Sequence, residues 1–421
     1  MRVKKLSIGL RAMLAIFGAV LFVKGAATSQ ERVLRSFNNA DGAAPYAGLI
    51  FDAAGNLYGT TYEGGVYGYG TVFELISTTG GGWTEKVLHN FNDSEEDGSH
   101  PNASLTFDGS GNLYGTTING GGAGVGTVFE LTPSAYGRWV AKPLHIFENN
   151  GVDGNAPYAS LIFDAAGNLY GTTVAGGAHD YGTVFELSPI TGGGWMETVL
   201  HSFDADGMDG TYPFSSLIFD GSGNLYGTTS EGGNGVGCSA GCGTAFELAS
   251  GAGGTWTETL LYSFNEADGF SPQAGLIFDA AGDLYSTTYR GGAYGYGVVF
   301  ELTPAVEGSW TETVLYSFNA TGSGTYPYAG LIFDNTGNLY GTTAFSGSGS
   351  CSSVAVLGCG TVFELTPQTG GGWAEKVLQT FNGRDGLSPY SGLILDASGN
   401  LYGTTFNGGA YKHGAVFEIT P

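Results

Sequence analysis

Leu49–Thr61, with the sequence LIFDAAGNLYGTT, is the stretch that decides the fold. A short apolar run, a four-residue turn and a second run rich in aromatic and β-branched residues together predict a β-hairpin. Gly55 and Asn56 in the turn tolerate a positive φ, which is a strong hairpin signal between two strands. The hairpin returns six times, and the position of Asn56 recurs at intervals of 56, 56, 56, 59, 55 and 62 residues (Asn112, Asn168, Asn224, Asp283, Asn338 and Asn400).

Each repeat contains two further strand candidates, which are Thr71–Leu75 and Trp83–Phe91 in the first repeat. A period of this size with strands in every unit is typical of a propeller or an array, because one unit cannot bury its own apolar faces. The first strand, Leu49–Asp52, is continuously apolar and is expected at the centre. The fourth strand alone carries regular charges, Glu85 and Lys86, which predicts an edge strand facing water.

The ends of the chain predict that the repeats close into a ring. The last repeat stops after its third strand, at Val416–Pro421, whereas Glu31–Phe37 matches Glu85–Phe91 of the first repeat. A strand within residues 29–38 is therefore expected to complete the C-terminal blade, which removes the sheet edges of an open solenoid. The predicted fold is all-β: a seven-bladed β-propeller with four-stranded blades, forming a single domain over residues 28–421.

Residues 1–27 have the features of a secretory signal peptide: a basic start, an apolar core over Ala12–Val23 and a small-residue cleavage site at Gly25–Ala27. The 12-residue core is short of the roughly 20 residues that span a bilayer, and an uncleaved N-terminal anchor is the alternative. We therefore expect a protein that is secreted, extracellular or held in the cell envelope or periplasm, with no membrane span after cleavage.

Cleavage would leave nine Lys and Arg residues against 38 Asp and Glu residues, a formal net charge of −29. This charge argues against nucleic acid and anionic membrane surfaces as partners. Cations, neutral glycans and basic proteins remain compatible with it, and so does a simple role in keeping a monomer soluble.

The four cysteines form two local pairs, each in a loop between the second and third strands. Cys238 lies four residues before Cys242, and Cys351 lies eight residues before Cys359. In an oxidising compartment these pairs predict two disulfides that staple the two loops. No His or further Cys accompanies either pair at ligand spacing, so no metal site is predicted there.

Several polar residues recur from repeat to repeat and are interpreted as structural. Glu74 and its equivalents share one environment, whereas acid–base catalysis needs carboxylates with separated pKa values. Asp52 and its equivalents are expected to cap the hairpin turn, and the tryptophans that begin the fourth strands are expected to be packing anchors. His89, His145 and His201 share a register with Arg, Tyr and Gln in other repeats, so they are not predicted to be ligands.

An Asp-Gly pair recurs in six of the loops that cross between blades. Aspartates gathered on one face of a ring could hold Ca²⁺ through oxygen ligands, although Asp-Gly is also a common turn. Calcium is therefore the one candidate cofactor, and no other metal is predicted. The aspartates are Asp41, Asp97, Asp153, Asp209, Asp268 and Asp385.

A binding site is expected where the repeat pattern is broken. The loops between second and third strands and the blade-crossing loops should open on the same face of the ring, so their variable residues would share one surface. Aromatic residues with scattered polar groups suit sugar stacking or protein docking, although solvated loop tips would look the same. The candidates are Tyr67, Tyr69, His179, Asp180, Tyr181, Arg290, Tyr294, Tyr296, Tyr411, Lys412 and His413.

No nucleophile elbow, phosphate loop or zinc-protease helix is present in the sequence, and no catalytic residue is predicted. The favoured function is a binding or interaction module for a glycan or a surface protein. The alternatives are a carbohydrate-active or lactone-type hydrolase or lyase with its site in the central channel, and a purely structural envelope protein. Enzyme activity is left open and is not the favoured interpretation.

The string Gly48–Thr61, followed by Gly64–Gly65 and Gly70–Phe73, resembles the GloVer tandem repeat of the "choice-of-anchor" bacterial surface proteins. The resemblance extends over nearly all of the mature chain, and the Asp-x-x-Gly-Asn-Leu-Tyr hairpin is also similar to blades of the two-component-regulator sensor propellers. It implies export, in a family that often carries a C-terminal sorting or anchoring segment, and it implies no activity or catalytic residues. The residues up to Pro421 lie within the expected ring and contain no such segment.

Overall fold

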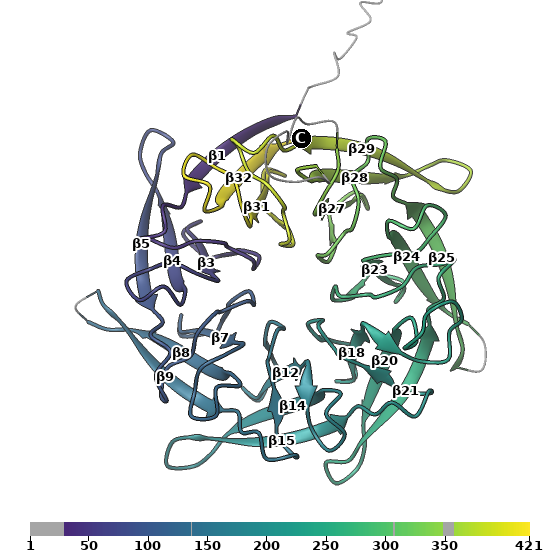
Figure 1. The fold of residues 1–421 in the computed structure, drawn as a ribbon, viewed down its shortest axis with the longest axis horizontal. Helices are drawn as coiled ribbons and strands as arrows, with labels where there is room; N and C mark the ends of the chain where they lie inside the picture. Colours follow the sequence, from purple (N-terminus) through teal and green to yellow (C-terminus); the bar gives the residue numbers. More distant parts are fainter. Residues whose placement is uncertain (1–28, 136, 306–307, 348–357) are drawn as a thin grey trace, which may run out of the picture.

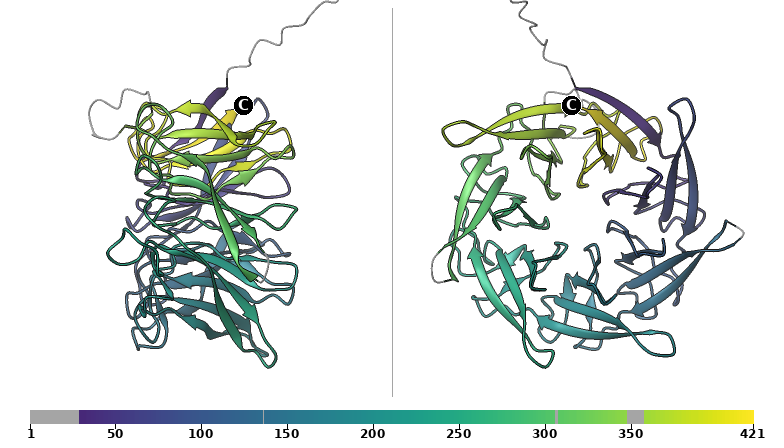
Figure 2. Two further views of the ribbon diagram at one scale, coloured as in Figure 1. Left: turned by 90° about the vertical axis from the view of Figure 1, so that its right-hand side faces the viewer. Right: turned by 180° about the vertical axis from the view of Figure 1, so that it is seen from behind.

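The computed structural model describes residues 29–135, 137–305, 308–347 and 358–421, and these residues form a ring of seven four-stranded antiparallel sheets (Figure 1). No α-helix occurs in these ranges. Seen edge-on, the ring is a disc with loops on both faces (Figure 2). The predicted seven-bladed propeller is confirmed. The predicted signal peptide, residues 1–27, lies outside the described residues.

Each blade runs from an inner strand to an outer strand. The innermost strands are β2 (Ile50–Phe51), β6 (Thr106–Phe107), β11 (Ile162–Phe163), β17 (Ile218–Phe219), β22 (Ile277–Phe278), β26 (Ile332–Phe333) and β30 (Ile394–Leu395). The second strands are β3 (Leu57–Thr61), β7 (Leu113–Thr117), β12 (Leu169–Thr173), β18 (Leu225–Thr229), β23 (Leu284–Thr288), β27 (Leu339–Thr343) and β31 (Leu401–Thr405). The third strands are β4 (Thr71–Ser77), β8 (Thr127–Pro133), β14 (Thr183–Pro189), β20 (Thr244–Ser250), β24 (Val298–Pro304), β28 (Thr361–Pro367) and β32 (Ala415–Thr420). The outer strands are β5 (Trp83–Asn90), β9 (Trp139–Ile146), β15 (Trp195–Ser202), β21 (Trp256–Ser263), β25 (Trp310–Ser317), β29 (Trp373–Thr380) and β1 (Gln30–Ser36). We number the blades 1 to 7 in this order, so β1 belongs to blade 7.

The N-terminal strand closes the ring as predicted. β1 pairs antiparallel with β32, from Gln30 opposite Thr420 to Ser36 opposite Ala415, and the sheet order in blade 7 is β1-β32-β31-β30. Figure 1 shows the purple β1 beside the yellow β32, at the two ends of the colour scale. The two ends of the described chain are therefore held in one blade.

The core lies between neighbouring blades as well as within them. Phe91 at the end of β5 is fully buried and packs edge-to-face on Phe129 of the next blade, with ring centroids 5.2 Å apart. Trp139 of blade 2 packs on Tyr58 of blade 1 at 6.4 Å, which confirms the tryptophans as packing anchors between blades. Each blade therefore depends on its neighbour for burial.

The inner strands are shorter than predicted. The expected strand Leu49–Asp52 pairs only at Ile50 and Phe51, because Asp52 belongs to the hairpin turn and its backbone N–H donates to the Asn56 carbonyl at 3.0 Å.

Gly70, before the third strand, is required by the backbone conformation and by close packing. It has a φ of 98°, and a Cβ there would lie 2.3 Å from the Thr61 carbonyl and 2.7 Å from Pro101 Cδ of the next crossing loop.

The prediction that the charges of the outer strand face water is wrong for Glu85, because one face of this strand packs against the neighbouring blade. Lys86 is exposed, whereas the Glu85 side chain is only 4% exposed and points into the boundary between blades 7 and 1. The alternation of the strand directs every second residue against the neighbouring blade. A carboxylate at this position is buried although the strand lies on the edge of its sheet.

The repeated acidic residues within the blades are structural, as predicted. The Tyr58 hydroxyl donates to Glu74 Oε1 at 2.7 Å, and the same bond joins Tyr114 to Glu130 at 2.8 Å. In the hairpin turn of blade 3, Asp164 accepts hydrogen bonds from the backbone N–H groups of Ala166 and Asn168, both at 2.8 Å. The Asn168 side-chain amide donates to its second oxygen at 2.8 Å.

Asp164→Ala is expected to lower the free energy of unfolding by about 1–3 kcal/mol, because it leaves the turn donors without their acceptor. Urea denaturation followed by fluorescence measures this change. Thr198→Ala, on an exposed face of the outer strand in the same blade, is the control and is expected to change the midpoint little. An equal midpoint for Asp164→Ala and the parent chain would contradict the capping role.

Candidate functional site

The loop face is formed as predicted, by the blade-crossing loops and the loops between second and third strands. In blade 3 the two loops pair through β10 (Gly154–Asn155) and β13 (Ala175–Gly176). In blade 4 they pair through β16 (Gly210–Thr211) and β19 (Glu231–Gly232), and isolated bridges join the corresponding loops elsewhere. The variable residues of both loop types therefore lie on the same face.

The predicted site residues fall into two groups on this face. The first group is exposed at or near the loop tips and consists of Tyr67, His179, Asp180, Arg290, Tyr294, Tyr411 and Lys412. The second group lies at blade boundaries, where the backbone carbonyl of each residue accepts a hydrogen bond from the next blade at 2.8–2.9 Å; it consists of Tyr69, Tyr181, Tyr296 and His413. The two groups come from blades 1, 3, 5 and 7. Within the described chain, the aromatic contacts of Tyr69, Tyr181 and Tyr296 reach the next blade and not one another.

A group of aromatic residues that sequence reasoning did not single out lies at the centre of the loop face. Each crossing loop contains a proline, and the residue after this proline lines one or both of two central pockets. Tyr46 stacks on Tyr390 at 5.0 Å and meets the edge of Tyr328 at 5.4 Å. Tyr158 packs on Phe214 at 5.1 Å. We call the group the mouth cluster; its members are Tyr46, Tyr158, Phe214, Tyr328 and Tyr390.

The mouth cluster borders two pockets that share four of its members as lining residues. A pocket of about 280 Å³ is lined by Tyr46, Tyr158, Phe214 and Tyr328 together with Tyr62, Asn102 and Phe406. A second pocket of about 260 Å³ has the mouth cluster on one side and a layer of Ser and Gly residues from the start of the inner strands on the other. In that layer Ser104 and Ser160 of adjacent blades are bonded through backbone N–H and Oγ at 3.1 Å. Adjacent blades are therefore joined directly in this layer.

The channel mouth is electrically neutral. Among the described residues that line the two pockets there is no Asp, Glu, His, Lys, Arg or Cys. Burial, followed by interactions with neighbouring tyrosines, raises the pKa of Tyr46, and burial raises the pKa of Tyr328 to about 12. Both hydroxyl groups therefore stay protonated at neutral pH, and they can donate as well as accept hydrogen bonds.

The mouth cluster extends outward over blades 5 and 6. Tyr328 contacts Tyr289 at 5.9 Å, Tyr289 contacts Tyr326 at 5.1 Å, and Tyr326 contacts Tyr296 at 5.6 Å. The guanidinium of Arg290 lies 5.4 Å from the centre of the Tyr289 ring. Two predicted site residues, Arg290 and Tyr296, are thus joined to the channel mouth through aromatic contacts.

The sequence did contain a signal for the mouth cluster. The residue after the crossing-loop proline is Tyr or Phe in five repeats, and it is Asn102 or Gln273 in the other two. The position is aromatic in most repeats but not in all of them, so it looks neither like an invariant structural residue nor like part of an irregular loop. Only the ring brings these residues from separate repeats to one axis.

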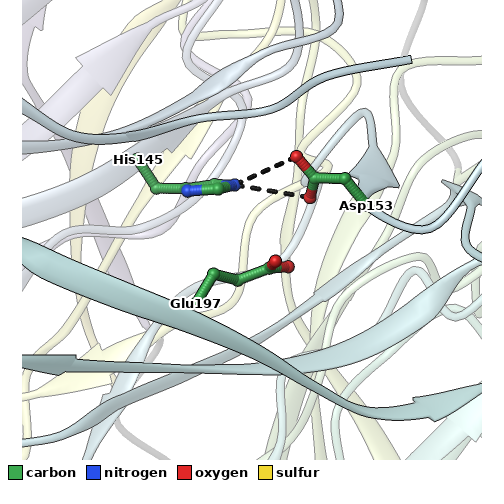
Figure 3. Close-up of side chains that lie close together, drawn as sticks. All are labelled: His145, Asp153 and Glu197. Carbon is green, nitrogen blue, oxygen red and sulfur yellow. Dashed lines mark hydrogen bonds and ion pairs between the residues drawn. The ribbon is translucent and has the colours of Figure 1, made fainter. Parts of the chain in front are cut away.

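Polar side chains also meet at the rim, between the outer strands of adjacent blades. His145 in β9 contacts Asp153 in its own crossing loop, with Nε2 at 3.3 and 3.2 Å from the two carboxylate oxygens. Glu197 of β15 in the next blade lies beside this pair (Figure 3), and the ligand atoms of the three residues all fall within 4.8 Å of one another. Burial, and secondarily Asp153, raises the pKa of Glu197 to about 7.

The other crossing-loop aspartates occupy the same place in their blades. Asp97 accepts from His89 at 3.0 Å, Asp268 from Tyr262 at 2.7 Å and Asp385 from Gln379 at 3.1 Å. Each aspartate is held by the outer strand of its own blade and so lies at a separate blade boundary. Calcium binding by a group of these aspartates remains an untested prediction.

The disulfide between Cys238 and Cys242 is present, with Cα atoms 5.3 Å apart. It staples the loop between β18 and β20, as predicted. Cys359 is disulfide-bonded as well. Its predicted partner, Cys351, lies outside the described residues, so that pairing remains a prediction.

The pattern of the Gloeobacter/Verrucomicrobia repeat matches residues 18–240 and 236–421, which together include nearly the whole chain. The chain belongs to the Gloeobacter/Verrucomicrobia repeat family. This membership agrees with the resemblance seen in the sequence. A comparison with curated proteins finds no match.

Two solved structures similar to this Gloeobacter/Verrucomicrobia repeat protein are enzymes by description. One is a luciferin-regenerating enzyme, with 12% identity, a TM-score of 0.44, and coverage of 93% of this chain and 95% of that chain. The other is described as a candidate oxidoreductase (glucose dehydrogenase) from Thermus thermophilus, with 14% identity, a TM-score of 0.41, and coverage of 93% of this chain and 100% of that chain.

In the described residues, no helix is both long enough and apolar enough to span a membrane.

Proposed function

We propose that this β-propeller is a binding module that takes a neutral glycan at the mouth of its central channel. The observation that carries the proposal is the mouth cluster, five aromatic side chains from five blades that converge on one hollow. Aromatic faces stack on the apolar faces of sugar rings, and neutral tyrosine hydroxyls and the side-chain amides of Asn102 and Gln273 can hydrogen-bond to sugar hydroxyl groups. The predicted loop residues Arg290 and Tyr296 would contact the parts of a longer glycan that leave the channel.

A neutral ligand fits the charges better than an anionic one. The lining offers no cation, and the mature chain would carry a formal net charge of −29. The same lining supports binding in preference to the hydrolase or lyase alternative, because it offers no separated acid and base at the channel. A surface protein would typically bury about 800 Å² on each partner, so it would have to contact the exposed loop tips as well as the mouth cluster.

We further propose that the protein acts outside the cytoplasm, in the extracellular space or the envelope. The basic and apolar character of residues 1–27 supports this proposal. So does the Cys238–Cys242 disulfide, because disulfides persist mainly in oxidising compartments. Expression in a bacterial host with and without residues 1–27, followed by fractionation of medium, periplasm and cells, tests it.

Replacing two mouth tyrosines is expected to weaken glycan binding without unfolding the ring. Tyr328→Gln and Tyr390→Asn introduce residues that Gln273 and Asn102 already provide at equivalent positions, so the fold should tolerate them. Each lost ring is expected to cost roughly 1 kcal/mol, or roughly a factor of five in affinity. Isothermal titration of a panel of neutral and anionic oligosaccharides, with thermal stability measured in parallel, determines the effect.

The matched control is Tyr67→Ala together with Tyr294→Ala, which removes two exposed loop-tip tyrosines and leaves the mouth unchanged. If only the loop-tip variant lost binding, the site would lie on the loops and the channel proposal would be wrong. If no neutral oligosaccharide bound the parent chain at millimolar concentration, the glycan proposal would be rejected in favour of a protein partner or a structural role.

A further inference from the structure

We propose that His145, Asp153 and Glu197 form a binding site for a divalent transition metal, with Zn²⁺ as its best-fitting occupant, at the rim between blades 2 and 3. One imidazole nitrogen and two carboxylate oxygens are ligand types that zinc accepts, and a tetrahedral site would take a water as its fourth ligand. The site is remote from the channel, and its role would be to fasten two outer strands together.

Asp153 and His145 are held in place by hydrogen bonds within the protein. Asp153 is buried, and its two oxygens accept backbone N–H groups from Glu148 at 2.8 Å and from Gly154 at 2.7 Å. His145 extends from β9 and Glu197 from β15, and the three ligand atoms lie within 4.8 Å of one another (Figure 3). The His145 side chain is 20% exposed, which leaves a path from solvent to the site.

One carboxylate oxygen of Glu197 lacks a hydrogen-bond partner in this arrangement. This atom, Oε1, is buried and faces the carboxylate of Asp153. The two carboxylates repel each other, and His145, which lies beside both, can offset this repulsion when it is protonated. A divalent ion bound by both would supply a positive charge and satisfy the orphaned oxygen.

The boundary between blades 7 and 1 shows that this place in the fold accepts a cation. There the residue at the His145 position is Arg35. It forms ion pairs with Asp41 and with Glu85, whose Oε2 lies 2.6 Å from the Arg35 Nε. Asp41 and Glu85 are the equivalents of Asp153 and Glu197. At the boundary between blades 2 and 3 no arginine is present, and an imidazole occupies its register instead.

The neighbouring boundaries provide internal comparisons. At the boundary of His89 and Asp97, the position equivalent to Glu197 is Ala141, which cannot be a ligand. His201, Asp209 and Glu258 have the same residue types, but in the described part of the chain only the His145 group brings three ligand atoms within 4.8 Å. The inference is therefore specific to one of the seven boundaries.

The test is zinc stoichiometry in the full mature chain, freed of any histidine tag and stripped with EDTA. Zinc is added in slight excess, the protein is desalted, and bound metal is measured by mass spectrometry. Thermal unfolding is followed in parallel, because an ion that binds the native state raises its stability. We expect one tightly bound zinc and a higher melting temperature with zinc than with EDTA.

Two variants remove ligands with substitutions that the chain itself tolerates. Glu197→Ala copies Ala141, and His145→Gln copies Gln379 at the equivalent register. Each is expected to weaken zinc binding by more than about tenfold, since even partners outside the first ligand shell typically contribute that much. Glu258→Ala removes the equivalent glutamate at the next boundary and is expected to keep the bound zinc.

Absence of bound zinc in the stripped and reloaded parent chain would overturn the proposal. Equal zinc binding by the parent chain, Glu197→Ala and His145→Gln would also overturn it, because the metal would then lie on other histidines such as His179 or His413. A parallel titration with Ca²⁺ separates this site from the calcium hypothesis for the aspartates, since calcium prefers sites made only of oxygen ligands.

Discussion

A chain that begins at residue 39 is expected to unfold without a single cooperative transition and to aggregate, because blade 7 loses its outer strand. The truncation removes β1, which pairs with β32 over Gln30 to Ser36. It also removes Phe37, which is fully buried and packs on Phe73 of blade 1 at 5.1 Å. An open ring would expose β32 as an unpaired edge.

The expected loss is a large fraction of the stability of an ordinary domain. Replacing a single buried Phe by Ala costs about 3–5 kcal/mol, and the truncation removes a whole strand in addition to Phe37. Native proteins are typically stable by only about 5–15 kcal/mol. We therefore expect a fall of more than about 10 °C in melting temperature, or no folded protein at about 37 °C.

Size-exclusion chromatography and differential scanning calorimetry of the truncated chain and of a chain that begins at residue 28 measure this effect. A synthetic peptide of residues 29–38, added in trans, is expected to restore part of the lost stability by re-forming the β1–β32 pair. A scrambled peptide of the same composition is the control. A truncated chain that melts within a few degrees of the full chain would show that ring closure is not required for the fold.

Stability is expected to fall as pH rises from about 5 to about 8, because buried glutamates at the blade boundaries resist ionisation. Burial, with a nearby aspartate as the second cause, raises the pKa of Glu31 and Glu85 to about 7 and that of Glu312 to about 8. Glu31 faces Asp385, Glu85 faces Asp41 and Arg35, and Glu312 faces Asp268. In each case the charged form is disfavoured where two blades meet.

The sign follows from the difference between the folded and unfolded states. Below about pH 4.5 these glutamates are protonated in both states and do not affect the free energy of unfolding. Between about pH 4.5 and pH 8 the unfolded chain releases the protons while the folded chain retains them, so the unfolded state gains in relative stability. One unit of pKa corresponds to about 1.4 kcal/mol, and partial exposure to solvent reduces this to on the order of 1 kcal/mol for each glutamate.

Glu312→Gln isolates the effect from the general repulsion of an acidic chain. Gln resembles the protonated carboxyl in shape, so the variant is expected to match the parent chain at about pH 5. At about pH 8.5 it should be more stable by on the order of 1 kcal/mol. Urea midpoints at the two pH values measure the difference, and Glu95→Gln in an exposed crossing loop is the control. Equal stability of the parent chain and Glu312→Gln at the higher pH would show that Glu312 ionises freely.

The sequence by itself determined the architecture of this protein. The recurrence of the Leu49–Thr61 hairpin gave the number of blades, and the match between Glu31–Phe37 and Glu85–Phe91 gave the closure of the ring. The second strand, Leu57–Thr61, was predicted to the residue. These features follow from local patterns, because turn residues and apolar runs act within a single repeat.

The tertiary structure alone decided which residues from different repeats meet. Tyr46 and Tyr328 are 282 positions apart in the sequence, and only closure of the ring places them at one channel mouth. Glu85 looked like a solvated charge on an edge strand, yet the neighbouring blade buries it. Glu197 likewise reaches His145 and Asp153 only across a blade boundary. Local patterns specify what each blade is, whereas burial and electrostatics at a site depend on the neighbour that packs against it.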